Sequence, residues 1–163
     1  MLNLLHKAEL ALPAILRDEA SWKSVFVDYH NPFVERLWCE WQGNRIYLHR
    51  IHPCESGEAL FHTHPWPSAM KVLDGSYEMG IGYGSESSES PVAARRIHMA
   101  GSEYEMMEPN GKHYVRPLNG PSISLMVTGK PWGGNSPKSD KPLSELPLDK
   151  QEELFNFFRS VYK

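Results

Sequence analysis

The sequence contains little cysteine and no long hydrophobic run. Only Cys39 and Cys54 occur among its 163 residues, and they do not form a zinc-type pair. We therefore expect two free thiols in a reducing compartment, which predicts a cytoplasmic protein. No apolar run approaches the roughly 18–20 residues that cross a bilayer. Residues 1–7 also lack the features of a secretory leader, so no membrane partner is expected.

A strong charge of either sign is also absent. The formal net charge is −3 at pH 7, and 23% of the residues are charged. Such a near-balanced chain has no electrostatic reason to bind nucleic acid. The length and the hydrophobic fraction of 40% are sufficient for one domain with its own core. We predict a single domain over residues 1–163.

Proline and glycine, by contrast, are frequent. The chain has thirteen prolines and twelve glycines, and those between residues 22 and 128 separate short apolar runs, a pattern typical of an all-β domain with many turns. The Asp74-Gly75 pair is the strongest hairpin signal. About nine short strands at regular spacing predict a β-sandwich or a jelly-roll β-barrel. The polar segments 84–90 and 129–141 are predicted to be loops.

Helical periodicity occurs only at the two ends of the chain. Residues 2–19 are predicted to form a helix that Pro13 kinks or breaks. Residues 149–162 are predicted to form a second helix, with Asp149 as its N-cap and Glu152 at the capping-box spacing. Both helices carry apolar stripes, which indicates a packing role and no chemistry.

The most informative stretch is His62-Thr63-His64, followed by Pro65 and Trp66. Side chains two residues apart point to the same face of a strand, and the proline excludes a continuing helix. Two imidazoles on one face are suited to binding a transition metal. Taken alone, such a pair could equally be surface decoration or two hydrogen-bonded histidines at a barrel mouth. A third histidine, His113, begins a strand after the turn at residues 109–111.

Two motifs resemble those of the cupin superfamily. The first is His62-Thr63-His64 with Gly75 at the following hairpin, and the second runs from Gly101 to His113. The resemblance covers about residues 34–128 and includes small bacterial cupin-like proteins with an HxHPW sequence. It implies a cupin jelly-roll barrel with His62, His64 and His113 as metal ligands. The glutamate of the first cupin motif is missing, because its place falls at about Ser68.

Three neutral histidines would leave coordination positions open on a mononuclear divalent metal, at which a substrate or O₂ could bind. Iron(II) (Fe2+) is the first choice, and Zn2+, Ni2+ and Mn2+ remain open. Some cupin dioxygenases that act on thiols have a three-His site, so the resemblance implies a small-molecule substrate and dioxygenase chemistry. A non-catalytic ligand-binding cupin and a metal-dependent isomerase or lyase are the alternatives.

Other side chains are candidates for the substrate pocket or for solvent. Tyr47, His49 and Trp66 are pocket candidates, although packing at a barrel rim would also explain them. His98, flanked by two arginines, is predicted to lie on a solvated face. No catalytic residue is assigned. Because open edge strands tend to be paired or covered, we expect a homodimer.

Overall fold

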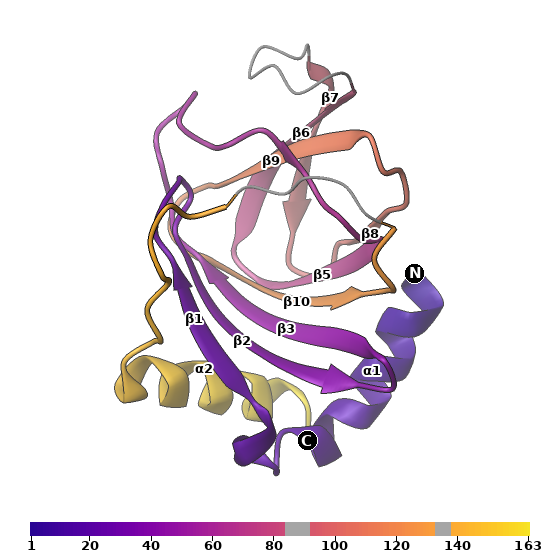
Figure 1. Cartoon of the computed structure of the whole chain (residues 1–163), viewed down its shortest axis with the longest axis vertical. Helices are drawn as coiled ribbons and strands as arrows, with labels where there is room; N and C mark the ends of the chain where they lie inside the picture. Colours follow the sequence, from indigo (N-terminus) through magenta and orange to yellow (C-terminus); the bar gives the residue numbers. More distant parts are fainter. Residues whose placement is uncertain (84–91, 133–137) are drawn as a thin grey trace.

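A computed structural model describes residues 1–83, 92–132 and 138–163 (Figure 1). The predicted loop at 84–90 and part of the one at 129–141 lie outside these residues. The strands are β1 (Lys23–Val27), β2 (Val34–Trp41), β3 (Asn44–Ile51), β4 (His62–Thr63), β5 (Ser68–Asp74), β6 (Ser76–Tyr83), β7 (Val92–Met99), β8 (Glu103–Met106), β9 (Gly111–Pro117) and β10 (Ser122–Thr128). The helices are α1 (Leu2–Ile15) and α2 (Leu148–Val161), and a short 3₁₀ helix spans Glu19–Ser21.

The strands form two antiparallel sheets that face each other. The larger sheet has the order β1-β2-β3-β10-β5-β8, and the smaller has the order β4-β9-β6-β7. Both terminal helices lie against the outer face of the larger sheet (Figure 1). This arrangement confirms the predicted all-β jelly roll with helices at its ends.

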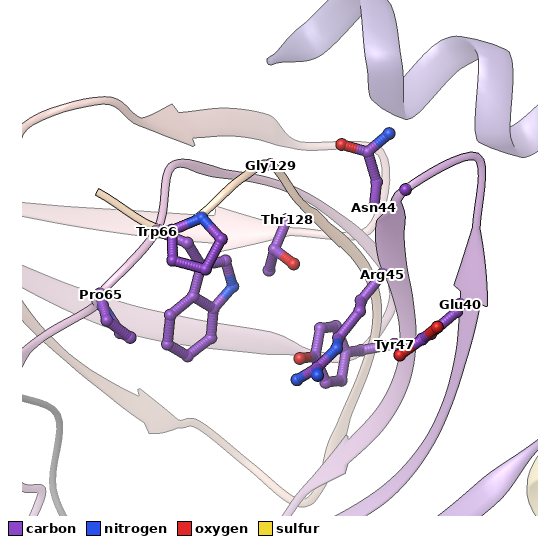
Figure 2. A pocket seen from close by; sticks show the side chains of 10 residues that line it. Glu40, Asn44, Arg45, Tyr47, Pro65, Trp66, Thr128 and Gly129 are labelled. Carbon is purple, nitrogen blue, oxygen red and sulfur yellow. The ribbon is translucent and has the colours of Figure 1, made fainter. Parts of the chain in front are cut away.

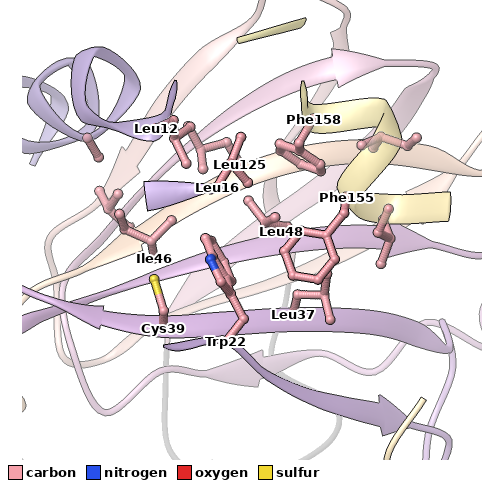
Figure 3. Close-up of a cluster of buried hydrophobic side chains, with 14 of the residues drawn as sticks. Leu12, Leu16, Trp22, Leu37, Cys39, Ile46, Leu48, Leu125, Phe155 and Phe158 are labelled. Atoms are coloured by element: carbon pink, nitrogen blue, oxygen red, sulfur yellow. The ribbon is translucent and has the colours of Figure 1, made fainter. Parts of the chain in front are cut away.

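The larger sheet is buried on both faces, and β10 shows this best because all seven of its residues are buried. Leu125 packs toward the helices with Leu12, Leu48 and Phe158 (Figure 3). Met126, its neighbour, belongs instead to the apolar cluster between the sheets. Alternate residues of each central strand therefore serve two different cores. The inner of these two cores surrounds the candidate site.

The predicted extent of the first helix was wrong. Helix α1 ends at Ile15 and continues through Pro13 without a break. The last turn is stabilised from outside the helix: the indole of Trp22 donates to the carbonyl of Ile15 at 3.2 Å, and Arg159 donates to that of Leu16 at 2.7 Å. Tertiary hydrogen bonds thus satisfy carbonyls that a further helical turn would otherwise use.

The predicted capping box of the second helix was also wrong. Pro147 is the N-cap of α2 and makes no side-chain cap hydrogen bond, while Asp149 lies in the first turn. The carbonyl of Pro147 accepts from the backbone N–H groups of Lys150 and Gln151. Asp149 still favours this end electrostatically, because a negative charge near a helix N-terminus is stabilising.

The structure bears on two features of the sequence, the lack of a long apolar run and the two cysteines. Over the described ranges, no helix is long and apolar enough to cross a bilayer. Cys39 and Cys54 are both free thiols, and Cys39 is buried.

Candidate metal centre

Three histidines from two neighbouring segments meet at one end of the smaller sheet. His62 of β4 lies directly opposite His113 of β9 in the antiparallel pair. His64 follows one residue after β4, which ends at Thr63 and is shorter than predicted. Trp132 fixes this exit, since its indole N–H donates to the carbonyl of His64 at 3.3 Å and its backbone N–H donates to that of Pro65.

The nitrogens of these rings are spaced as ligands of one ion would be. Nε2 of His64 lies 2.8 Å from Nε2 of His113, and the donor atoms of all three histidines lie within 4.8 Å of one another. Two nitrogens bound at about 2.1 Å and at right angles to each other would be about 3 Å apart. The close His64–His113 pair therefore has the separation of two adjacent ligands.

The hydrogen bond of His62 selects its tautomer. Nδ1 lies 2.9 Å from the carbonyl oxygen of Leu60. Because a carbonyl only accepts, Nδ1 carries the hydrogen, and the lone pair of Nε2 is left free. A backbone carbonyl behind a histidine is the usual way in which a metal-binding ring is oriented.

Burial keeps the three rings neutral. It lowers the pKa of His62 to about 4 and the pKa of His113 to about 3. It also lowers the pKa of His64 well below its ordinary value, and the neighbouring histidines add to that effect. Neutral imidazoles have the lone pairs that a metal requires. At pH 7 this cluster is therefore in the protonation state of a ligand set.

The three histidines form part of the wall of a cavity of about 190 Å³. The other polar lining includes His30, His49, Arg36 and Trp66. Most of the remaining wall is apolar and comes from both sheets: Val27, Val34, Ile51, Met70, Val115 and Met126. No carboxylate from the described part of the chain lines this cavity.

The missing glutamate has no substitute in β5. Met70 lines the cavity, whereas Lys71 points the other way and pairs with Glu9 at 2.8 Å and Glu103 at 3.1 Å. Ser68 is buried at the start of the strand. Any ion held here would therefore have three nitrogen ligands from the described residues, with its other positions open to small molecules.

The predicted pocket residues lie in two cavities. His49 and Trp66 line the cavity with the three histidines. Tyr47 instead lines a neighbouring cavity of about 340 Å³, which shares Trp66. Figure 2 shows Trp66 and Pro65 on one side of this second cavity, across from Arg45 and Tyr47. Trp66 thus belongs to the wall of both cavities.

The prediction for His98 was wrong, and Arg36 was missed. His98 is buried, and its ring lies 4.6 Å from that of Tyr104. It is the one buried residue of β7, which is otherwise exposed. Arg36 shares the face of β2 with Val34, which packs between the sheets. Strand alternation could have placed Arg36 in the interior, but an arginine in a strand is usually assigned to solvent.

Comparison with known proteins adds evidence on the fold. No family model matches the sequence, and no curated protein matches it either. Hydroxypropylphosphonic acid epoxidase from S. wedmorenis matches with a TM-score of 0.50 at 15% identity, over 65% of this chain and 55% of that one. A structure of FeII HppE matches with a TM-score of 0.50 at 13% identity, over 65% of this chain and 56% of that one. KdgF from Halomonas sp. matches with a TM-score of 0.47 at 14% identity, over 71% of this chain and 89% of that one.

These neighbours are cupin-fold proteins. The present chain spans about half the length of the epoxidase chains that it matches. At such low identity the likeness concerns the fold alone.

Proposed function

We propose that this chain, which has the cupin fold, is a metal-dependent enzyme that acts on a small molecule. Its mononuclear divalent ion would be held by His62, His64 and His113. The observation that carries the proposal is the 2.8 Å approach of the His64 and His113 Nε2 atoms in the wall of a largely apolar cavity. These two atoms are hydrogen-bonded to each other, and a bound ion would replace that contact as a common partner for all three rings.

Iron(II) is the proposed metal, and O₂-dependent oxidation is the proposed chemistry. A divalent ion on three neutral nitrogens keeps positions open, where it supplies Lewis acidity to a substrate or a binding place for O₂. One of the structural neighbours is described as an iron(II) form of an epoxidase, which supports iron as the first metal to test.

The chain's own residues would prepare this site in three ways. The Leu60 carbonyl orients His62 and leaves the lone pair of its Nε2 free. Burial keeps all three rings neutral at pH 7. Apolar side chains such as Met70, Val115 and Met126 form part of the cavity wall, and a less polar surrounding would strengthen electrostatic interactions there.

Elemental analysis tests the metal directly. Tag-free protein would be loaded with iron(II) under anaerobic conditions, freed of excess metal and analysed beside two variants. We expect roughly one iron per chain in the wild type and almost none in His62→Ala/His64→Ala. His52→Ala, which removes a histidine outside the cavity, should bind as much iron as the wild type. Equal iron in all three proteins would refute the site.

A second experiment separates the reaction classes. Nitric oxide, used as a stand-in for O₂, should give an iron–nitrosyl EPR signal with the iron-loaded protein if open positions are accessible. Absence of that signal from a stoichiometric iron protein would count against the oxygenase and leave the isomerase or lyase, which do not require O₂. Absence of any bound metal would favour a non-catalytic ligand-binding protein.

We also propose a homodimer, and the cytoplasm as the compartment. Strand β7 pairs only with β6 among the described strands, and nearly all of its residues are exposed. Ile97 and Met99 are apolar side chains on this edge, with exposed fractions of 53% and 59%. Exposed edges of this kind favour pairing with another chain. The two free thiols are consistent with a reducing compartment.

A further inference from the structure

A positive charge lies in the wall of the candidate metal cavity. Arg36 lies on β2 directly opposite His49 on β3. Its Nε donates to Nε2 of His49 at 3.0 Å, and its guanidinium lies over the ring of Tyr47, 5.3 Å from the ring centre. These two contacts hold the side chain between the sheets, where it lines the same cavity as the three histidines.

Arg36 has no acidic partner in the described parts of the chain. Arg50, by contrast, pairs with Glu35 at 2.7 Å and with Glu153 at 3.0 Å. Arginine stays charged in proteins and offers five N–H donors, of which one is used for His49. The other ionisable groups around the cavity are Tyr29 and five histidines, so none supplies a carboxylate. An unpaired charge in such a place is costly unless a ligand neutralises it.

Two further donors nearby lack an acceptor. Because Nε2 of His49 accepts from Arg36, the hydrogen of this ring is on Nδ1. That atom is buried and has no partner among the described residues, and the same holds for the indole nitrogen of Trp66. Both residues line the cavity. Because both of these atoms are fully buried, the donors available to a ligand in the cavity are those of the Arg36 guanidinium, which favours a ligand with acceptor oxygens.

The cavity also limits the size and the polarity of the ligand. Its volume of about 190 Å³ is below the roughly 300–1,000 Å³ of pockets for drug-sized molecules. Apolar side chains make up half of the residues that line it. A ligand of a few carbons, with one anionic end, would satisfy both properties.

We infer that the cavity binds a small aliphatic carboxylate, whose anionic group pairs with the guanidinium of Arg36 while the rest of the molecule lies toward the three histidines. The planar fork of one guanidinium matches a carboxylate in geometry and in charge. This inference rests on the proposed function and specifies its substrate class. Arg36 is accordingly a specificity residue, distinct from the histidines that would hold the ion.

Calorimetry with matched pairs of small molecules tests the inference. Cobalt(II)-loaded protein would be titrated with butanoate, 2-hydroxybutanoate and 3-mercaptopropanoate, with the neutral amide of each acid, and with propylphosphonate. At least one acid should bind about 10-fold or more tightly than its amide, and more tightly than the phosphonate. The Arg36→Met variant should bind that acid about 10- to 100-fold more weakly.

Two controls make the result specific. Arg45→Met removes an exposed arginine of β3 that lies over Trp38, and it should bind the acid as the wild type does. Arg36→Lys keeps the charge without the fork, and an intermediate affinity is expected; it also provides a test if Arg36→Met does not fold. Cobalt content, measured separately, should be the same in all four proteins.

Four outcomes would overturn the inference: no acid binds, acids and amides bind equally, the phosphonate binds best, or Arg36→Met binds as the wild type does. Loss of cobalt from the wild type would instead refute the proposed metal site. The two failures are therefore distinguishable.

Discussion

Arg36 and His49 lie opposite each other on β2 and β3, and the guanidinium Nε donates a 3.0 Å hydrogen bond to the imidazole Nε2. Burial lowers the pKa of His49 well below its ordinary value, and the charge of Arg36 adds to this effect. The ring is therefore a neutral acceptor at pH 7, and it holds the arginine in place without cancelling its charge.

Replacing His49 should weaken binding of the carboxylate through the position of Arg36. We expect His49→Leu, which cannot accept a hydrogen bond, to reduce the affinity several-fold. His49→Gln should recover most of it, because its amide oxygen can accept from Nε. Calorimetry on the cobalt-loaded variants measures both effects. Equal affinities of the leucine and glutamine variants would contradict the positioning role.

Acid should destabilise the metal-free protein through the buried histidines. Their folded-state pKa values, about 4 for His62 and about 3 for His113, lie below the ordinary value of 6.5. The unfolded chain therefore binds more protons as the pH falls below about 6.5, so the free energy of unfolding decreases until the folded-state values are passed. The shift of His62 alone corresponds to roughly 3 kcal/mol. Urea unfolding between pH 7.5 and pH 4 measures the loss.

Two variants separate this effect from general acid unfolding. His62→Gln should show a shallower loss of stability between pH 6.5 and pH 4. His6→Gln, which alters an exposed side chain paired with Glu103, should follow the wild-type curve. If the His62 and His6 variants behave alike, buried histidines are not the cause.

The core beneath the helices should be sensitive to truncation. Leu125 is fully buried between β10 and the terminal helices (Figure 3). Leu125→Ala should lower the free energy of unfolding by about 2–5 kcal/mol, because it removes apolar contacts and leaves a cavity. Leu10→Ala is the matched control, since this leucine of α1 is 85% exposed, and its effect should be within about 0.5 kcal/mol. Chemical denaturation measures both.

The exposed edge of the smaller sheet should carry the proposed dimer contact. Ile97→Lys places a charge on β7 and should convert the dimer to a monomer in light scattering. Leu10→Lys, an equally drastic change at another exposed position, should leave the dimer intact. A monomeric wild type would refute the proposed assembly, and a dimeric Ile97→Lys would place the contact elsewhere.

The sequence predicted the features that depend on residues close together in the chain. The spacing of His62 and His64 and the turn before His113 brought together the three residues that the structure places side by side. The frequent turns predicted the jelly roll, because strand alternation and turn residues are local properties. The resemblance to cupin motifs implied that all three histidines are ligands of one metal.

Other features depend on contacts between distant residues. The end of α1 is set by Trp22 and Arg159, which lie outside the helix. Arg36 was missed because an arginine in a strand is usually assigned to solvent, although it shares a face of β2 with the buried Val34. His98 was assigned to solvent because Arg95 and Arg96 lie on the same strand, whereas the ring of Tyr104 packs against it in the fold.

The most direct test of the central claim is anomalous diffraction from crystals of the cobalt(II)-loaded protein. We predict one peak, in contact with Nε2 of His62, His64 and His113. The described chain contains a second cluster of potential ligands, His6, Glu9 and Glu103, in which Lys71 already pairs with both glutamates. A peak at that cluster with none between the three histidines would contradict the account, as would the absence of any peak.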